Sequence, residues 1–326
     1  MLLSAYRNLA IRSLFASILP FTAYAGVYNA DIVNYANNSF SHCAIAADGT
    51  LDNCDSYITS GSNALLHGPS SLKFYGEYVY VTNSDDNSYV QCPVKNSEIY
   101  YTDCKRFSPS GAGALNKPSG IAFKGEYAYI TNMGNGTYTR CNLDDNGINS
   151  SSCQTISTGA ATNSDPAAMS FIGDKAYIVN FYNNSYTQCQ VNNDVIDSTS
   201  CENITPSGSG ALNGPTGIII NEVFNGSTYR TYAYITNLNN SSYTQCQIND
   251  NVLDPTSCKT TVLSGGGALD DPSTIAITNG YIYITNINSH SYTQCLIGYD
   301  GIESSTCKTN MSVTNYFMSV SGLDFT

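Results

Sequence analysis

The amino-acid sequence predicts an all-β fold: a six-bladed β-propeller built from four-stranded antiparallel blades. Three observations lead to this prediction. A unit of about fifty residues is repeated six times, and repetition at that period is typical of propellers and solenoids. Each unit holds four short segments rich in aromatic and β-branched residues, separated by turns. The two ends of the chain together supply one complete unit.

The marker of the repeat is the pentapeptide Ser-Tyr-Thr-Gln-Cys, which stands unchanged at Ser185–Cys189, Ser242–Cys246 and Ser291–Cys295. Looser copies end at Cys43, Cys92 and Cys141. One unit is longer than the others because Asn221–Thr231 extends its first hairpin. Insertions of this kind are tolerated at exposed loop tips, so we read this one as a surface feature.

The third unit shows how each strand is assigned. Ser119–Phe123 is short and apolar, as expected of a strand covered on both faces. After a tight turn, Tyr127–Asn132 forms the second strand because it is aromatic and β-branched. A polar loop leads to a third strand at Thr137–Leu143. A hairpin turn at Asp144–Gly147 follows, and the fourth strand is expected to carry Cys153.

The chain ends predict how the repeats close. Val320–Thr326 matches the first-strand pattern of Pro118–Lys124, and no unit follows it. Gly26–Asn34 matches the second-strand pattern of Gly125–Asn132 and has no first strand before it. An open solenoid, the alternative, needs capping repeats at its ends. The last strand is therefore expected to pair beside the first and close a ring that leaves only short edges exposed.

Twelve cysteines are distributed as one pair in each unit. An even count behind an export signal predicts six disulfides within the units, and hence an oxidising compartment. Zinc is the rival reading, but structural zinc sites bring cysteines in close doublets that are missing here. The predicted pairs are Cys43 with Cys54, Cys92 with Cys104, Cys141 with Cys153, Cys189 with Cys201, Cys246 with Cys258, and Cys295 with Cys307.

Residues 1–25 have the pattern of an export signal. Arg7 and Arg12 supply its positive flank, an apolar stretch follows, and Ala23-Tyr24-Ala25 has the small-x-small form of a cleavage site. A membrane anchor is disfavoured because about twenty uninterrupted apolar residues are needed to span a bilayer, and this stretch is shorter. We therefore predict a signal peptide at 1–25, a single propeller domain at 26–326, and a secreted or periplasmic protein without a membrane span.

Composition narrows the partners. The chain has 326 residues, 42% hydrophobic and 12% charged, which is typical of a globular protein rather than a disordered one. Its net charge is -12. Nucleic-acid binding requires clustered Lys and Arg, so a nucleic-acid partner is not expected.

Short second-strand motifs resemble a known repeat family. Tyr80-Val81-Thr82-Asn83 spells the signature of YVTN-type β-propeller repeats, and Tyr129–Asn132, Tyr234–Asn237 and Tyr283–Asn286 are close variants. The run at Pro118–Phe123 is similar to the opening strand of NHL repeats. The resemblance implies the propeller fold. It does not imply one function, because such propellers serve both as binding scaffolds and as enzymes.

The loops that follow the second strands are the predicted binding site. In a four-stranded meander these loops and the blade-crossing segments emerge at the same end, which we call the loop end. Recognition normally sits on loops carried by a rigid frame. The repeated Asn and Ser of these loops are expected to close turns. The residues that differ from blade to blade are the ligand-binding candidates: Tyr35, Asp85, Asp86, Met133, Phe181, Tyr182 and His290.

Two further residue classes bear on function. The aromatic residue of each third strand is expected to pack between blades. A propeller hydrolase or lactonase needs acids or histidines that converge on the channel, often around Ca²⁺. Asp324 is the only acid in the predicted channel strands, and the three histidines occupy different places in the repeat. We therefore expect no catalytic residue, metal ligand or cofactor, with Ca²⁺ retained as the alternative.

The sequence thus predicts an exported, monomeric and non-catalytic binding scaffold that recognises a protein or a glycan through its loop end. Two alternatives stay open. One is a calcium-dependent propeller hydrolase or lactonase, and the other is a structural surface protein without a small ligand.

Overall fold

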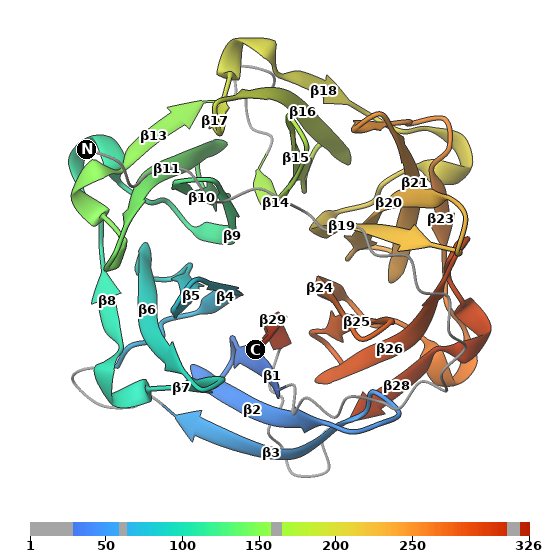
Figure 1. Cartoon of the computed structure of the whole chain (residues 1–326), viewed down its shortest axis with the longest axis horizontal. Coiled ribbons are helices and arrows are strands. Elements are labelled where there is room, and N and C mark those ends of the chain that lie inside the picture. Colours follow the sequence, from blue (N-terminus) through green and yellow to red (C-terminus); the bar gives the residue numbers. More distant parts are fainter. Residues whose placement is uncertain (1–28, 59–63, 158–164, 312–319) are drawn as a thin grey trace, which may run out of the picture.

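The structure is a computed structural model that describes residues 29–58, 64–157, 165–311 and 320–326. The predicted export signal and its cleavage site lie outside the described residues. Six antiparallel sheets are arranged around a central channel (Figure 1), which confirms the predicted six-bladed propeller.

The strands are named by their place in the blade, counted outward from the channel. The first strands are β29 (Val320–Phe325), β4 (Pro69–Tyr75), β9 (Pro118–Lys124), β14 (Pro166–Ile172), β19 (Pro215–Phe224) and β24 (Pro272–Thr278). The second strands are β1 (Asn29–Asn34), β5 (Tyr78–Asn83), β10 (Tyr127–Asn132), β15 (Lys175–Asn180), β20 (Tyr229–Asn237) and β25 (Tyr281–Asn286).

The outer half of each blade follows the same order. The third strands are β2 (Ser39–Ile45), β6 (Ser88–Lys95), β11 (Thr137–Asp144), β16 (Ser185–Asn192), β21 (Ser242–Asn249) and β26 (Ser291–Gly298). The fourth strands are β3 (Leu51–Ile58), β8 (Lys105–Phe107), β13 (Gln154–Ser157), β18 (Glu202–Ile204), β23 (Lys259–Thr261) and β28 (Lys308–Met311).

Short elements fill the turns between these strands. Two-residue strands pair antiparallel with the end of the third strand in five blades: β7 (Glu98–Ile99), β12 (Gly147–Ile148), β17 (Val195–Ile196), β22 (Val252–Leu253) and β27 (Gly301–Ile302). Single 3₁₀ turns precede four of the fourth strands: η1 (Tyr101–Asp103), η3 (Ser150–Ser152), η4 (Ser198–Ser200) and η7 (Ser304–Thr306). Three more lie in the blade crossings: η2 (Gly111–Gly113), η5 (Gly208–Gly210) and η6 (Gly265–Gly267).

The ring closes as the chain ends predict. Strand β29 pairs antiparallel with β1, so that blade 1 has the order β29-β1-β2-β3. The closing strand also packs against blade 2. At Gly322 an added Cβ would lie 2.6 Å from the backbone nitrogen of Leu72, so a residue without a side chain is needed for this close approach. The C-terminal residues therefore form the inner strand of the first blade.

All twelve cysteines form the six predicted disulfides, one per blade. In blade 1 the bridge joins the third strand to the fourth, and in the other five blades it joins the third strand to the residue directly before the fourth. One detail of the prediction is wrong: Cys153 does not lie within a strand but directly precedes β13, because the 3₁₀ turn η3 occupies the residues before it. Six intrachain disulfides indicate an oxidising environment, such as the extracellular space or the periplasm.

The blades pack through aromatic side chains, as predicted for the third strands. Tyr89, Tyr138, Tyr186, Tyr243, Tyr292 and Phe40 are all buried. Second-strand tyrosines add hydrogen bonds across the blade interface. The hydroxyl of Tyr129 donates to the backbone oxygen of Asp194, and that of Tyr283 donates to Gly49, each in the next blade. Burial and these bonds together fix the angle between neighbouring blades.

The repeated asparagine at the end of each second strand is a buried bracket rather than a simple turn residue. The side-chain nitrogen of Asn132 donates to the hydroxyls of Thr137 and Thr139 on the third strand. Its oxygen accepts from the backbone nitrogen of Asn116 in the blade crossing. The same side chain thus ties a second strand, a third strand and a crossing together at the loop end.

Candidate functional site

The loop end brings the second-to-third turns beside the blade crossings. In blade 2 the backbone nitrogen of Ser84 donates to Gly68, and in blade 3 that of Met133 donates to Lys117. The loops also bind the next crossing: the side chain of Asn87 accepts from the backbone nitrogen of Lys117. The frame around the predicted site is therefore fixed by backbone hydrogen bonds.

Two of the predicted binding residues are bonded to one another. The Tyr35 hydroxyl of blade 1 donates to a carboxylate oxygen of Asp85 in blade 2 at 2.9 Å. Both residues are exposed to solvent. The hydrogen bond to Asp85 raises the pKa of Tyr35, because the phenol proton is held by the carboxylate and ionisation would place two negative charges together. Tyr35 therefore stays a neutral donor at physiological pH.

Neighbouring residues fix the position of the Asp85 side chain. Its carboxylate lies over Gly68, where an added Cβ would collide with it. Gly68 also has a positive φ of 61°, which a side chain would strain. The hydroxyl of Ser84 gives the same carboxylate oxygen a second, longer contact at 3.4 Å.

A cleft of about 480 Å³ surrounds this pair between blades 1, 2 and 3. Tyr35, Asp85 and Met133 line it together, which brings three of the seven candidate residues to one place. Serine hydroxyls, side-chain amides and one lysine complete its wall: Ser70, Ser84, Ser119, Asn87, Asn116 and Lys117. Asn116 and Lys117 belong to a blade crossing. They were not predicted as site residues because the crossings were interpreted only as connections between blades.

The other four candidates lie outside this cleft. Asp86 forms an ion pair with Arg106 at 2.9 Å and accepts a hydrogen bond from Ser88. Phe181 packs partly into the core between blades 4 and 5, and the ring of Tyr182 meets it edge-on at 5.2 Å. Tyr182 itself is 70% exposed. His290 is exposed in the corresponding loop of blade 6, with a positive φ of 51°.

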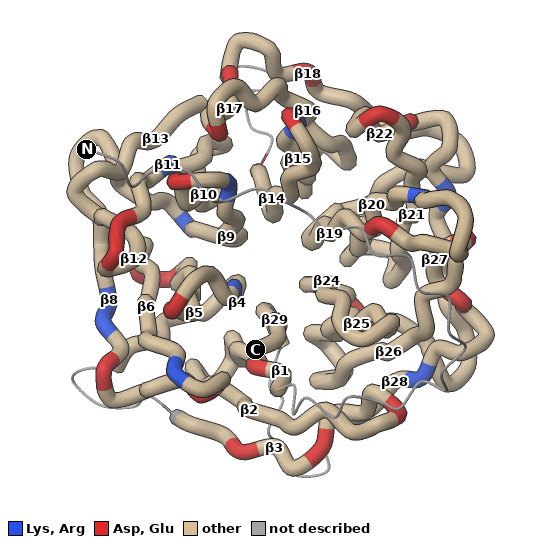
Figure 2. Tube along the Cα trace, in the orientation of Figure 1, with Lys and Arg blue, Asp and Glu red and all other residues tan. Residues whose placement is uncertain are grey.

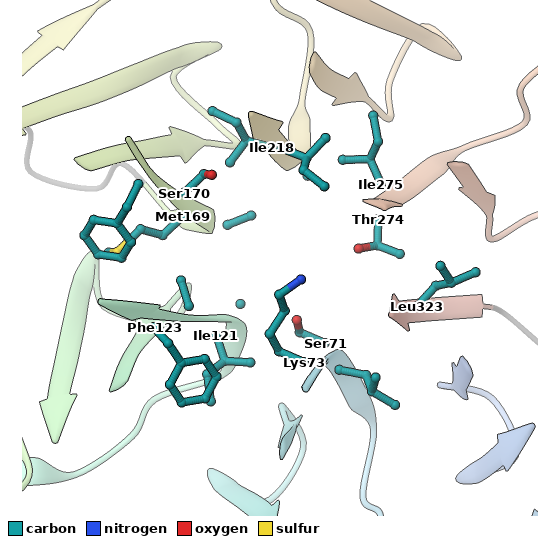
Figure 3. Close-up of a pocket in the computed structure, with 17 residues that line it drawn as sticks. Ser71, Lys73, Ile121, Phe123, Met169, Ser170, Ile218, Thr274, Ile275 and Leu323 are labelled. Atoms are coloured by element: carbon teal, nitrogen blue, oxygen red, sulfur yellow. The ribbon is translucent and has the colours of Figure 1, made fainter. Parts of the chain in front are cut away.

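The channel is lined by the first strands, as the sequence predicts. Apolar side chains, Ile121, Met169, Ile218, Ile275 and Leu323, share its walls with the polar Ser71, Ser170 and Thr274 (Figure 3). The Cα trace in Figure 2 shows the acidic and basic residues mostly on the outer strands and turns.

The channel wall also contains a lysine that forms an ion pair. The Lys73 amine lies 3.0 Å from the carboxylate of Asp324, which also accepts from the backbone nitrogen of Phe74. The sequence prediction named Asp324 but not Lys73. The lysine stands on the strand beside the acid only once the ring has closed.

Within the described ranges, no three His, Cys, Asp or Glu side chains come close enough together to hold a metal ion. In the same part of the chain, no helix has the length and apolar character needed to cross a bilayer.

Comparison with known proteins identifies the fold and no family. No family model matches the chain, and no curated protein matches it. Several solved structures do match the chain. A nidogen/laminin complex aligns with a TM-score of 0.63 at 12% identity, over 91% of this chain and 98% of that one. A putative 6-phosphogluconolactonase from Bacteroides uniformis aligns with a TM-score of 0.55 at 15% identity, over 93% and 86%.

A third match is a protein of unknown function from Bacteroides caccae, with a TM-score of 0.57 at 9% identity over 91% of this chain and 98% of that one. Identities this low show a shared propeller fold and nothing more specific. The resemblance to YVTN and NHL repeats therefore stays a prediction.

Proposed function

We propose that this protein is an exported binding scaffold that holds a carbohydrate in the cleft around Tyr35 and Asp85 without chemically changing it. The observation that carries the proposal is the fixed hydrogen bond between these two side chains inside a cleft shared by three blades. We further propose that residues 1–25 direct export and are removed, and that the propeller at 26–326 acts as a monomer related to the YVTN and NHL repeats.

The chemistry of the cleft suits a sugar. A carboxylate and side-chain amides can accept from and donate to neighbouring sugar hydroxyls, as Asp85, Asn87 and Asn116 are placed to do. The Tyr35 ring and the Met133 side chain add apolar surface for the C–H face of a pyranose ring. A cleft of this size accommodates one or two sugar units, whereas a protein partner typically covers a much larger area.

The test is a glycan-array screen of the mature protein, followed by calorimetry with the best-bound glycan. Asp85→Asn is expected to weaken binding by about tenfold or more, because a hydrogen bond to a charged group contributes about 1.5–3 kcal/mol. Asp86→Asn is the matched control, since the neighbouring acid faces Arg106 instead of the cleft.

An equal loss in both variants, or no glycan bound by the wild-type protein, overturns the proposal. Capture of a protein partner that is lost in Asp85→Asn would keep the cleft and replace the ligand class.

A further inference from the structure

One row of side chains sets blade 1 apart from the others. In blades 2 to 6 a buried tyrosine of the second strand stands directly opposite a Gln or Arg of the third strand: Tyr80 and Gln91, Tyr129 and Arg140, Tyr177 and Gln188, Tyr234 and Gln245, Tyr283 and Gln294. In blade 1 the same two positions hold Asp31 and His42. An acid and a histidine thus replace residues that elsewhere support the frame.

The replaced residues elsewhere reach across to the next blade. Gln91, Gln245 and Gln294 each donate to a backbone oxygen in the following blade. Asp31 and His42 bond to one another instead, at 2.8 Å between a carboxylate oxygen and Nδ1. Asp31 is fully buried. Its second oxygen, Oδ2, has no hydrogen-bond partner among the described residues.

This pair lies at the closure of the ring. Asp31 of β1 stands opposite Asp324 of the closing strand β29 on one side and opposite His42 on the other. His42 in turn faces Asp55 on β3. A line of ionisable side chains therefore crosses blade 1 from the channel to the outer strand, with Lys73 of blade 2 at its inner end.

The charges along this line depend on one titratable residue. Three acids interact electrostatically with His42: Asp31, Asp55 and Glu98 of β7. Asp31 in turn interacts with Asp324 and with Tyr101 of η1. With His42 protonated, the cations of His42 and Lys73 flank the two facing carboxylates. Without that proton, Lys73 still pairs with Asp324, and the buried carboxylate of Asp31 is left without a counter-charge.

We propose that the Asp31–His42 pair makes the closure of the ring proton-dependent, so that β29 is held firmly on β1 when His42 is protonated and opens more often when it is not. The pairing of β29 with β1 can respond to this charge because Asp324 of β29 stands directly opposite Asp31 of β1. Repulsion between the two carboxylates therefore acts across the pairing, and local opening of single elements is a common low-energy fluctuation of folded proteins.

Hydrogen exchange of the intact protein tests this. Protection factors, corrected for intrinsic exchange, are measured from about pH 5.5 to about pH 8, where histidine titrates. Protection of β29 is expected to fall as pH rises, by about tenfold for each unit that separates the pKa values of His42 in the closed and open ring. The equivalent strand β14, which lies inside the chain, is the internal reference and should stay constant.

The double variant Asp31→Asn with His42→Gln should remove the pH dependence, because both side chains stay polar and similar in size. His290→Gln should leave it unchanged. If the double variant does not fold, titration of the His42 ring by NMR in the wild-type protein decides, since the chain has only three histidines. A flat β29 profile, or one that survives in the double variant, overturns the proposal.

Discussion

Tyr35 and Asp85 join blades 1 and 2 through a side-chain hydrogen bond, beside a second bond in which the backbone nitrogen of Gly68 donates to the side chain of Asn38. The phenol of blade 1 donates to the carboxylate of blade 2 across the edge of the cleft. A cross-blade bond at this position holds both side chains in one orientation before a ligand arrives, which reduces the entropy lost on binding.

Tyr35→Phe separates the two contributions of this tyrosine. The ring remains, so apolar contact with a bound sugar is retained, while Asp85 loses its donor. Affinity is expected to fall by several-fold, which corresponds to about 1 kcal/mol for one hydrogen bond, and Tyr35→Ala should cost more because the ring is lost as well. Calorimetry on the two variants measures the difference. Equal losses would show that the ring contributes nothing, and an unchanged affinity in Tyr35→Phe would show the same of the hydroxyl.

Two buried tyrosines at equivalent positions give a matched test of the blade interface. Tyr129 donates to the backbone oxygen of Asp194 at 2.6 Å, whereas the hydroxyl of Tyr234 is buried with no partner among the described residues. Tyr129→Phe is expected to lower the free energy of unfolding by about 1 kcal/mol, and Tyr234→Phe to leave it unchanged or raise it slightly. Urea denaturation measures both. The reverse order would contradict the assigned bonds.

Each disulfide is expected to contribute to stability within its own blade. Replacing Cys141 and Cys153 by alanine opens a loop with a sequence separation of 12 residues, and the chain-entropy argument gives a loss of about 3 kcal/mol. Chemical denaturation of the double variant measures the loss. Replacing Cys92 and Cys104 is the control, since a loop of the same length predicts a similar cost.

Stability is also expected to depend on pH through blade 1. The hydrogen bond with Asp31 raises the pKa of His42, and burial raises that of Asp31. A group whose pKa is raised on folding stabilises the protein below its unfolded pKa and loses that contribution as pH rises through the folded value. Both residues therefore act in the same direction.

The urea midpoint should fall as pH increases from about 6 to about 8, the range of histidine titration. His42→Gln should flatten this dependence. A midpoint that rises over the same range would exclude His42 and Asp31 as its main source.

Much of the frame follows from the sequence because the repeat determines it. The match between Val320–Thr326 and Pro118–Lys124 was enough to place β29 beside β1, and cysteine spacing was enough to pair all twelve cysteines. The exact start of β13 was not predictable, because the 3₁₀ turn before Cys153 has no periodic signal.

Contacts between side chains were harder to predict from the sequence. Tyr35 and Asp85 stand out as variable loop residues, but their hydrogen bond depends on how blades 1 and 2 are angled. Lys117 reaches the same cleft from a crossing that looks like a plain connection. Asp31 and His42 depart from the Tyr and the Gln or Arg of the other copies, and an alignment of the six units by position would have singled them out.

The order of the disulfides along the chain has a consequence for biosynthesis. Every cysteine is bridged to its nearest cysteine partner in the sequence, so no bridge encloses another. A chain that enters an oxidising compartment from its N-terminus can therefore oxidise each pair before the next pair emerges. Correct bridging then needs little reshuffling by an isomerase, even with twelve thiols in one polypeptide.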